Sequence, residues 1–280
     1  MGVGNIVFMD DIFMTKNKLT NIGFPKKQGL YDSDKEHDSC GVGLIADINN
    51  EASHDIVKKG LAMLCNLEHR GAVGADPKAG DGSGILIQIP HNFLLKEVKN
   101  VNLPEKNNYG VGVFFIKKDI KVKEAIFKLV EEICEKEKIP FLGWRECPTY
   151  GDELGWSVKP TIPLVYHLFV GKPENIDQQD DWERKIYVLR QCIDKAVAQM
   201  GDQYYDQFYI PSFSSRTILY KGMVLSDQVG TVGNQLGFFE DLSDPLIESS
   251  FALIHQRFST NTFPTWSLAQ PFRMLCHNGE

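Results

Sequence analysis

The sequence lacks any apolar run that approaches the length of a membrane-spanning helix, which argues against a transmembrane protein. Positive charge is also in short supply: 30 Lys and Arg residues stand against 37 Asp and Glu, for a net charge of −7. A nucleic-acid partner held by a basic surface is therefore not expected. The N-terminus has no long apolar segment typical of a signal peptide, because Asp10 and Asp11 divide its apolar residues. We expect a cytoplasmic protein with no membrane partner.

The six cysteines include no C-x-x-C pair and no histidines at metal-ligand spacing, so the sequence given predicts no zinc or iron–sulfur site. Without an export signal, free thiols are the simpler interpretation. Most of these cysteines are expected to be small buried apolar side chains.

The sequence also lacks internal repeats and low-complexity tracts, and its 280 residues suffice for one large domain or two small ones. Residues 1–39 are polar and show no sustained periodicity, which predicts a flexible leader with Met14 as an alternative start. The remainder, residues 40–280, alternates short apolar runs with amphipathic stretches.

Short apolar runs predict strands over residues 41–48, 85–89, 109–116, 141–147, 161–170, 208–213, 217–220, 251–258 and 274–277. Apolar residues at helical spacing predict a helix from a Ser53 cap to about residue 68, and helices over 92–98, 122–138 and 182–200. Strands in clusters with helices between them favour an α+β fold, with sheets packed face to face and helices outside.

Cys40 stands where the polar leader meets the first strand, with Gly41 and Gly43 on either side of Val42. No histidine has an obvious pairing with this cysteine. If residues 1–39 are removed, the α-amine of Cys40 can act as the base for its own thiol, because a free α-amine has an ordinary pKa of roughly 7.7–8.0. We therefore interpret Cys40 as an N-terminal nucleophile.

Three other clusters each admit a plain and a chemical interpretation. The glycines at 80, 82 and 84 suggest a tight turn more than a phosphate loop, because no Walker lysine or helix follows them. Arg257, at the end of an apolar strand, requires a carboxylate from the protein or from a ligand. Asn278-Gly279 is by default a turn, but its side-chain amide and backbone N–H could form an oxyanion hole. Together with Cys40, these clusters supply what cleavage of an amide requires.

These clusters belong to a longer set of motifs: Gly29-Leu30-Tyr31-Asp32, Glu36-His37-Asp38-Ser39-Cys40-Gly41-Val42-Gly43, Leu67-Glu68-His69-Arg70-Gly71-Ala72, Gly80-Asp81-Gly82-Ser83-Gly84, Gly143-Trp144-Arg145, the run from Phe208 to Thr217, the run from His255 to Trp266, and His277-Asn278-Gly279-Glu280. In these motifs and their order the chain resembles the class II (N-terminal nucleophile) glutamine amidotransferase part of glutamate synthase large subunits. The run from His255 to Trp266 is specific to glutamate synthases within that class.

The resemblance implies a four-layer αββα N-terminal nucleophile hydrolase fold and an autocatalytic propeptide that ends at Ser39. It implies that Cys40 attacks the side-chain amide of L-glutamine, that Asn278 and Gly279 hold the oxyanion, and that Arg257 and Thr260 bind the α-carboxylate. The released ammonia would then aminate 2-oxoglutarate in a separate flavin domain.

That second half would use FMN, a 3Fe–4S cluster, and electrons from NAD(P)H or ferredoxin, with a small subunit or ferredoxin as the partner that donates them. We expect residues 40–280 to be an amidotransferase domain that is truncated at its C-terminus, with none of these cofactors bound in the stretch given. Two alternatives remain open. One is another class II enzyme, of the glucosamine-6-phosphate synthase or phosphoribosyl amidotransferase type, and the other is a non-catalytic amino-acid-binding domain in which Cys40 is structural.

Overall fold

The computed structural model describes residues 27–29, 41–68, 71, 74–233, 235–256 and 263–273. The chain divides into two compact units, residues 1–39 and 40–280, and the second contains every helix and strand named below. The strands are β1 (Val42–Ala46), β2 (Ser83–Gln88), β3 (Tyr109–Ile116), β4 (Phe141–Glu146), β5 (Leu164–Gly171), β6 (Phe208–Ser214), β7 (Thr217–Gly222) and β8 (Phe251–Gln256). The helices are α3 (His54–Cys65), α4 (His91–Glu97), α5 (Ile120–Lys136), α6 (Gln179–Gln199) and α7 (Asp202–Tyr205), with short 3-10 helices η3 (Lys159–Thr161), η4 (Ser226–Gln228) and η5 (Glu240–Ser243).

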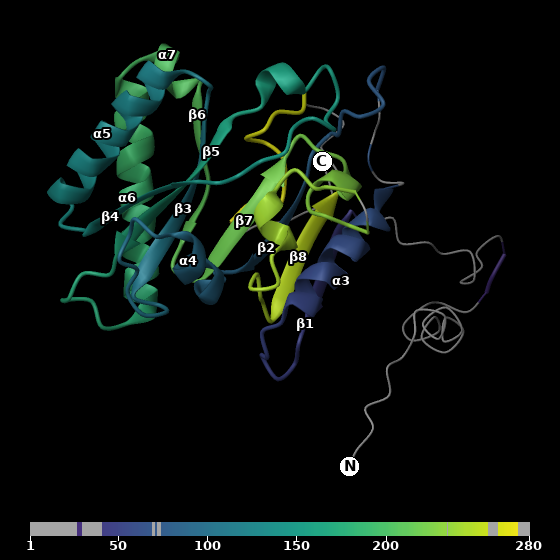
Figure 1. Ribbon diagram of the computed structural model, residues 1–280, viewed down its shortest axis with the longest axis horizontal. Helices are drawn as coiled ribbons and strands as arrows, with labels where there is room; N and C mark the ends of the chain where they lie inside the picture. The colour runs from purple at the N-terminus through teal and green to yellow at the C-terminus, as the bar shows by residue number, and fades with distance from the viewer. Residues whose placement is uncertain are drawn as a thin grey trace. The chain divides into compact units, whose positions relative to one another are not determined.

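The first sheet is antiparallel and has the strand order β1-β8-β2-β7 (Figure 1). Helix α3 covers one face of this sheet. A Cβ on Gly60 would lie 2.7 Å from the Cβ of Ala252 and 3.2 Å from Ile85, so the helix backbone packs directly on β8 and β2. Because successive side chains of a strand alternate between faces, Gly84 and His255 belong to the opposite face.

The second sheet, also antiparallel, has the order β4-β5-β3-β6 and is covered by α5 and α6 (Figure 1). Strand β3 is buried on both faces: Phe114 and Ile116 pack with these helices, whereas Val113 and Phe115 join the larger core that includes the first sheet. Burial on both sides explains why β3 is a continuous apolar run rather than an alternating one.

The capping residues explain where two of the helices begin. The Asp119 carboxylate accepts hydrogen bonds from the backbone N–H groups of Lys121 (2.8 Å) and Val122 (3.2 Å) at the start of α5. Ser53 caps α3 as the sequence predicted. Both side chains satisfy backbone donors that the first helical turn leaves free.

Most of the helices and strands expected from the sequence are present in the described structure, but several begin or end at other residues. Strand β3 has the predicted bounds, but α3 ends at Cys65, three residues before the predicted end, and β5 begins at Leu164 because residues 159–161 form η3. Helix α7 and the three 3-10 helices were not predicted. The strand expected over 274–277 and the end of the one expected over 251–258 lie outside the described residues. Within the described ranges, no helix has the length and apolar character needed to cross a membrane.

Candidate functional site

The predicted site residues Cys40, Arg257, Thr260, Asn278 and Gly279 lie outside the described residues. The structure does describe some of their sequence neighbours, namely Gly41, Gln256 and the segment Phe263–Arg273. These neighbours define the frame of the candidate site.

Strands β1 and β8 bring two of the predicted motifs to the same end of the first sheet. The backbone N–H of Gln256 donates to the carbonyl of Gly41 at 2.7 Å, and Val42 pairs with His255. Gly41 follows Cys40 in the chain and Gln256 precedes Arg257. The sheet therefore joins two motifs that are more than 200 residues apart in sequence.

A third motif meets the first two at Gln256, whose side chain is only 1% exposed. Gly71, from the Glu68-His69-Arg70-Gly71 run, lies so close that a Cβ on it would overlap the side-chain amide of Gln256. Within the described part of the chain, the Gln256 Oε1 is a buried acceptor without a hydrogen-bond partner. Such an orphan acceptor is uncommon in a folded core and marks this end of the sheet as polar.

The glycine-rich stretch from Gly80 to Gly84 lets other backbone segments approach closely. Gly82 has a φ of +123°, and a Cβ on it would lie 3.0 Å from that of Ala269. A Cβ on Gly84 would lie 2.9 Å from the carbonyl oxygen of Gln270. The stretch runs into strand β2 rather than into a helix, so it lacks the helix N-terminus of a phosphate loop.

The segment Phe263–Arg273 packs closely against Gly82 and Gly84, and Lys221 of β7 binds its backbone. The Lys221 Nζ donates to the carbonyls of Ser267 (2.8 Å) and Ala269 (2.6 Å). Burial, with a smaller effect from the charge of Arg190, lowers the pKa of Lys221 to about 7. At the start of the segment, the Trp266 indole N–H donates to Thr161 Oγ1 at 3.0 Å.

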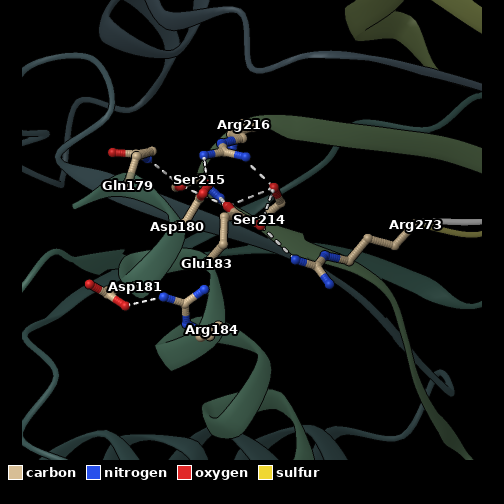
Figure 2. A network of polar contacts seen from close by, with 9 residues as sticks. All are labelled: Gln179, Asp180, Asp181, Glu183, Arg184, Ser214, Ser215, Arg216 and Arg273. Atoms are coloured by element: carbon tan, nitrogen blue, oxygen red, sulfur yellow. Dashed lines mark hydrogen bonds and ion pairs between the residues drawn. The ribbon is translucent and has the colours of Figure 1, made fainter.

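At the end of the same segment, Arg273 joins a polar network centred on Glu183 of α6, shown in Figure 2. The Glu183 carboxylate accepts from the Arg273 guanidinium (2.5 Å), from the Ser215 backbone N–H (2.5 Å), and from the hydroxyls of Ser215 (2.7 Å) and Ser214 (3.0 Å). Burial raises the pKa of Glu183, but the Ser215 hydrogen bonds and the charge of Arg273 outweigh burial and lower it. Glu183 is therefore a buried carboxylate held in its ionised form.

Outer members of this network contact the connection between the two sheets. Arg216 pairs with Asp180, and the Gln179 side-chain amide donates to Ser215 Oγ at 2.5 Å (Figure 2). Arg216 and Ser215 form the turn between β6 and β7, which leads from the second sheet to the first. The N-terminal end of α6 thus holds both this turn and Arg273.

A second buried cluster has metal-ligand residue types: the ligand atoms of Cys147, His167 and Asp241 lie within 4.8 Å of one another. Arg145 already donates to both oxygens of Asp241, at 2.8 and 2.7 Å, in the bidentate geometry of a strong ion pair. Tyr220 donates to the same carboxylate at 3.2 Å. The guanidinium thus supplies the positive charge that a metal ion would otherwise bring.

The direction of the Cys147 pKa agrees with an ion pair rather than a metal centre. Burial, reinforced by the charge of Asp241, raises the pKa of the Cys147 thiol, which disfavours the thiolate that a metal requires. Burial lowers the pKa of His167 to about 4, so its imidazole is neutral at pH 7. Sequence spacing could not have found the cluster, because Cys147 follows β4, His167 lies in β5 and Asp241 in η5.

The profile of the family described as "Glutamine amidotransferases class-II" matches residues 40–280. The chain belongs to the class-II glutamine amidotransferases. Among curated relatives of this class-II chain, "Glutamate synthase [NADPH] large chain" of Bacillus subtilis is 44% identical over 267 residues, which cover 95% of the chain and 17% of the relative. "Ferredoxin-dependent glutamate synthase 1, chloroplastic/mitochondrial" of Arabidopsis thaliana is 41% identical over 91% of the chain and 15% of the relative. "Glutamate synthase [NADH]" of Saccharomyces cerevisiae is 40% identical over 91% of the chain and 12% of the relative.

The class-II chain thus spans between 12% and 17% of the length of these three relatives. The family match confirms the class that the motifs predicted from the sequence. The mixed α/β structure, with two antiparallel sheets, agrees with the predicted α+β class.

Proposed function

We propose that this chain is the glutaminase part of a glutamate synthase, in which Cys40 hydrolyses the side-chain amide of L-glutamine and releases ammonia. The hydrogen bond between Gln256 and Gly41 is the observation that carries the proposal, because it joins the neighbour of the proposed nucleophile to the neighbour of the proposed carboxylate anchor. The names of the relatives favour a glutamate synthase over the glucosamine-6-phosphate synthase and phosphoribosyl amidotransferase types, and the catalytic family disfavours a purely binding domain.

In the proposed mechanism, the free α-amine of Cys40 takes the thiol proton and the sulfur attacks the amide carbon of glutamine. Arg257, with Thr260, binds the substrate α-carboxylate. The negative charge that develops on the amide oxygen is stabilised by the Asn278 side-chain amide and the Gly279 backbone N–H. Ammonia departs with the transferred proton, and water then cleaves the thioester to give glutamate and restore the thiol.

The proposed fold is the four-layer αββα arrangement of N-terminal nucleophile hydrolases, with residues 1–39 as a propeptide. Two antiparallel sheets, one packed against α3 and the other against α5 and α6, are compatible with that arrangement. The family match that begins at residue 40 supports Cys40 as the first residue of the mature domain.

In the whole protein we propose that the ammonia aminates 2-oxoglutarate in a flavin domain that contains FMN and a 3Fe–4S cluster. NADPH, NADH or ferredoxin would supply the electrons, and the names of relatives include each of these donors. The described residues do not fit the cluster: Cys134 and Cys147 are separately buried, and the one group of metal-ligand types around Cys147 is already bound to Arg145. We therefore propose that other parts of the protein bind the cluster.

The decisive experiment replaces Cys40 by Ala in the full-length protein. Glutamine-dependent glutamate formation should be abolished because the nucleophile is absent, whereas ammonia-dependent formation should persist because its site is separate. Cys192→Ala, which removes a half-buried thiol from α6, is the matched control and should preserve both activities. Equal loss of both activities in the Cys40 variant would instead assign Cys40 a structural role.

A further inference from the structure

We propose that Lys221 and the Glu183–Arg273 pair are positioning residues that fix the segment Phe263–Arg273, and through it the oxyanion donors Asn278 and Gly279. Asn278 follows Arg273 by only five residues. The proposal rests on the proposed glutaminase function and extends it to residues that would not touch the substrate.

Lys221 is the first attachment. Its side chain is fully buried, and its Nζ donates to two backbone carbonyls of the segment, those of Ser267 and Ala269. The Nζ also lies 5.0 Å from the ring centre of Tyr209 and 4.5 Å from that of Phe272. A buried polar group without hydrogen-bond partners is costly, so departure of the segment from this position would leave the Lys221 Nζ unsatisfied.

The segment wraps around β7, which is an edge strand of the first sheet within the described chain. Lys221 and Gly222 are consecutive in β7 and so face opposite sides of it. A Cβ on Gly222 would overlap the Trp266 indole, whereas the carbonyls of Ser267 and Ala269 bind Lys221. Contacts on both sides of one strand restrict movement of the segment in either direction.

The Glu183–Arg273 pair is the second attachment and the one nearer to Asn278. The two side chains are 15% and 13% exposed, and Glu183 is also held by Ser214 and Ser215 (Figure 2). Removal of one partner from a buried ion pair leaves an uncompensated charge, so the pair strongly favours one position of the Arg273 backbone. Arg273, which precedes Asn278 by five residues in the sequence, is therefore held at a fixed point.

This attachment has a specific kinetic consequence. Oxyanion donors act only when they lie about 2.7–3.1 Å from the oxygen that becomes charged. A misplacement of about 1 Å by a distant substitution can cost about 100-fold in rate. Because the oxyanion exists only in the transition state and the intermediate, we expect the loss in kcat rather than in KM.

The test uses Lys221→Met and Glu183→Gln in the full-length protein, since Gln keeps an oxygen that can accept from Ser214 and Ser215. We expect kcat for glutamine hydrolysis to fall about 100-fold with KM nearly unchanged. Glutamate γ-semialdehyde, whose hemithioacetal with the Cys40 thiol places its former aldehyde oxygen at the proposed oxyanion donors, should lose affinity in parallel with kcat. Ammonia-dependent synthesis should be unaffected. Glu137→Gln is the matched control, because Glu137 forms a comparable ion pair with Lys185 of α6 at 2.9 Å, away from the segment.

Arg273→Lys is a milder variant that keeps the charge opposite Glu183, and it should lose less activity than Glu183→Gln. Wild-type kcat in both main variants would overturn the proposal, as would equal loss of the glutamine- and ammonia-dependent activities, which signals general misfolding. Failure of the proposed function has a different signature, because the Cys40→Ala variant would then still hydrolyse glutamine.

Discussion

Buried ionisable side chains make the stability of this domain depend on pH. His167 is fully buried in β5, and burial lowers its pKa to about 4 from an ordinary value of 6.5. Between about pH 4 and pH 6.5, the imidazole of His167 is protonated in the unfolded chain but neutral in the folded chain. The contribution of His167 to the free energy of unfolding is therefore fully present above about pH 6.5 and is lost as the pH falls towards about 4.

We predict that hydrogen exchange of the β5 amides becomes faster at pH 5 relative to pH 7, after correction for intrinsic exchange rates, and that His167→Gln reduces this difference. The substitution removes the group that must be neutral in the folded state. Exchange measured by mass spectrometry on the full-length protein tests the prediction, with His54→Gln at the start of α3 as a control. An unchanged pH dependence in His167→Gln would assign the effect to other groups.

The sequence predicted the proposed chemical groups more readily than the residues that support them. Cys40, Arg257 and Asn278 stand in motifs with recognisable neighbours, so residue type and order sufficed to propose their roles. Lys221 gave no such signal because its acceptors are backbone carbonyls, 46 and 48 residues further along the chain, and every residue has a carbonyl. Glu183 looked like an ordinary polar residue of an amphipathic helix.

At the scale of secondary structure, elements with a strong local pattern were predictable and their partners were not. The apolar run of β3 and the spacing of Ile186, Leu189 and Ile193 in α6 follow directly from which faces are buried. The pairing of β1 with β8 depends on contacts between segments far apart in sequence, which no local pattern specifies. The ends of α3 and β5 shifted for a related reason, because local turns such as η3 interrupt the apolar run.

The contact between β7 and Trp266 gives a prediction for an element. Gly222→Ala should destabilise the domain by about 1–3 kcal/mol, because the new methyl group overlaps the indole ring. Hydrogen exchange of the β7 amides measures this loss of stability. Trp266→Leu in the Gly222→Ala background should recover part of it.

Gly74→Ala provides the control for this prediction, since a Cβ on Gly74 meets no atom within 4 Å. Equal stability of Gly222→Ala and the unchanged protein would show that the indole moves aside at little cost.

For the whole molecule, the proposed mechanism requires that Cys40 has a free α-amine. We predict that N-terminal sequencing and intact-mass measurement of the active full-length protein find Cys40 as its first residue. The Cys40→Ala protein should keep the mass of the uncleaved chain, since it lacks the thiol proposed to release the leader. Full glutaminase activity in protein that retains residues 1–39 would rule out the α-amine as the base.

The register between β1 and β8 also bears on when this domain can become active during its synthesis. Val42 is translated more than 200 residues before its partner His255. At about 5–20 residues per second, translation of that interval takes on the order of 10–40 seconds. Throughout this time β1 has no β8 to pair with. Cys40 is thus translated long before β8, and in the proposed mechanism its amine cannot act as a base until the peptide bond to Ser39 is cut.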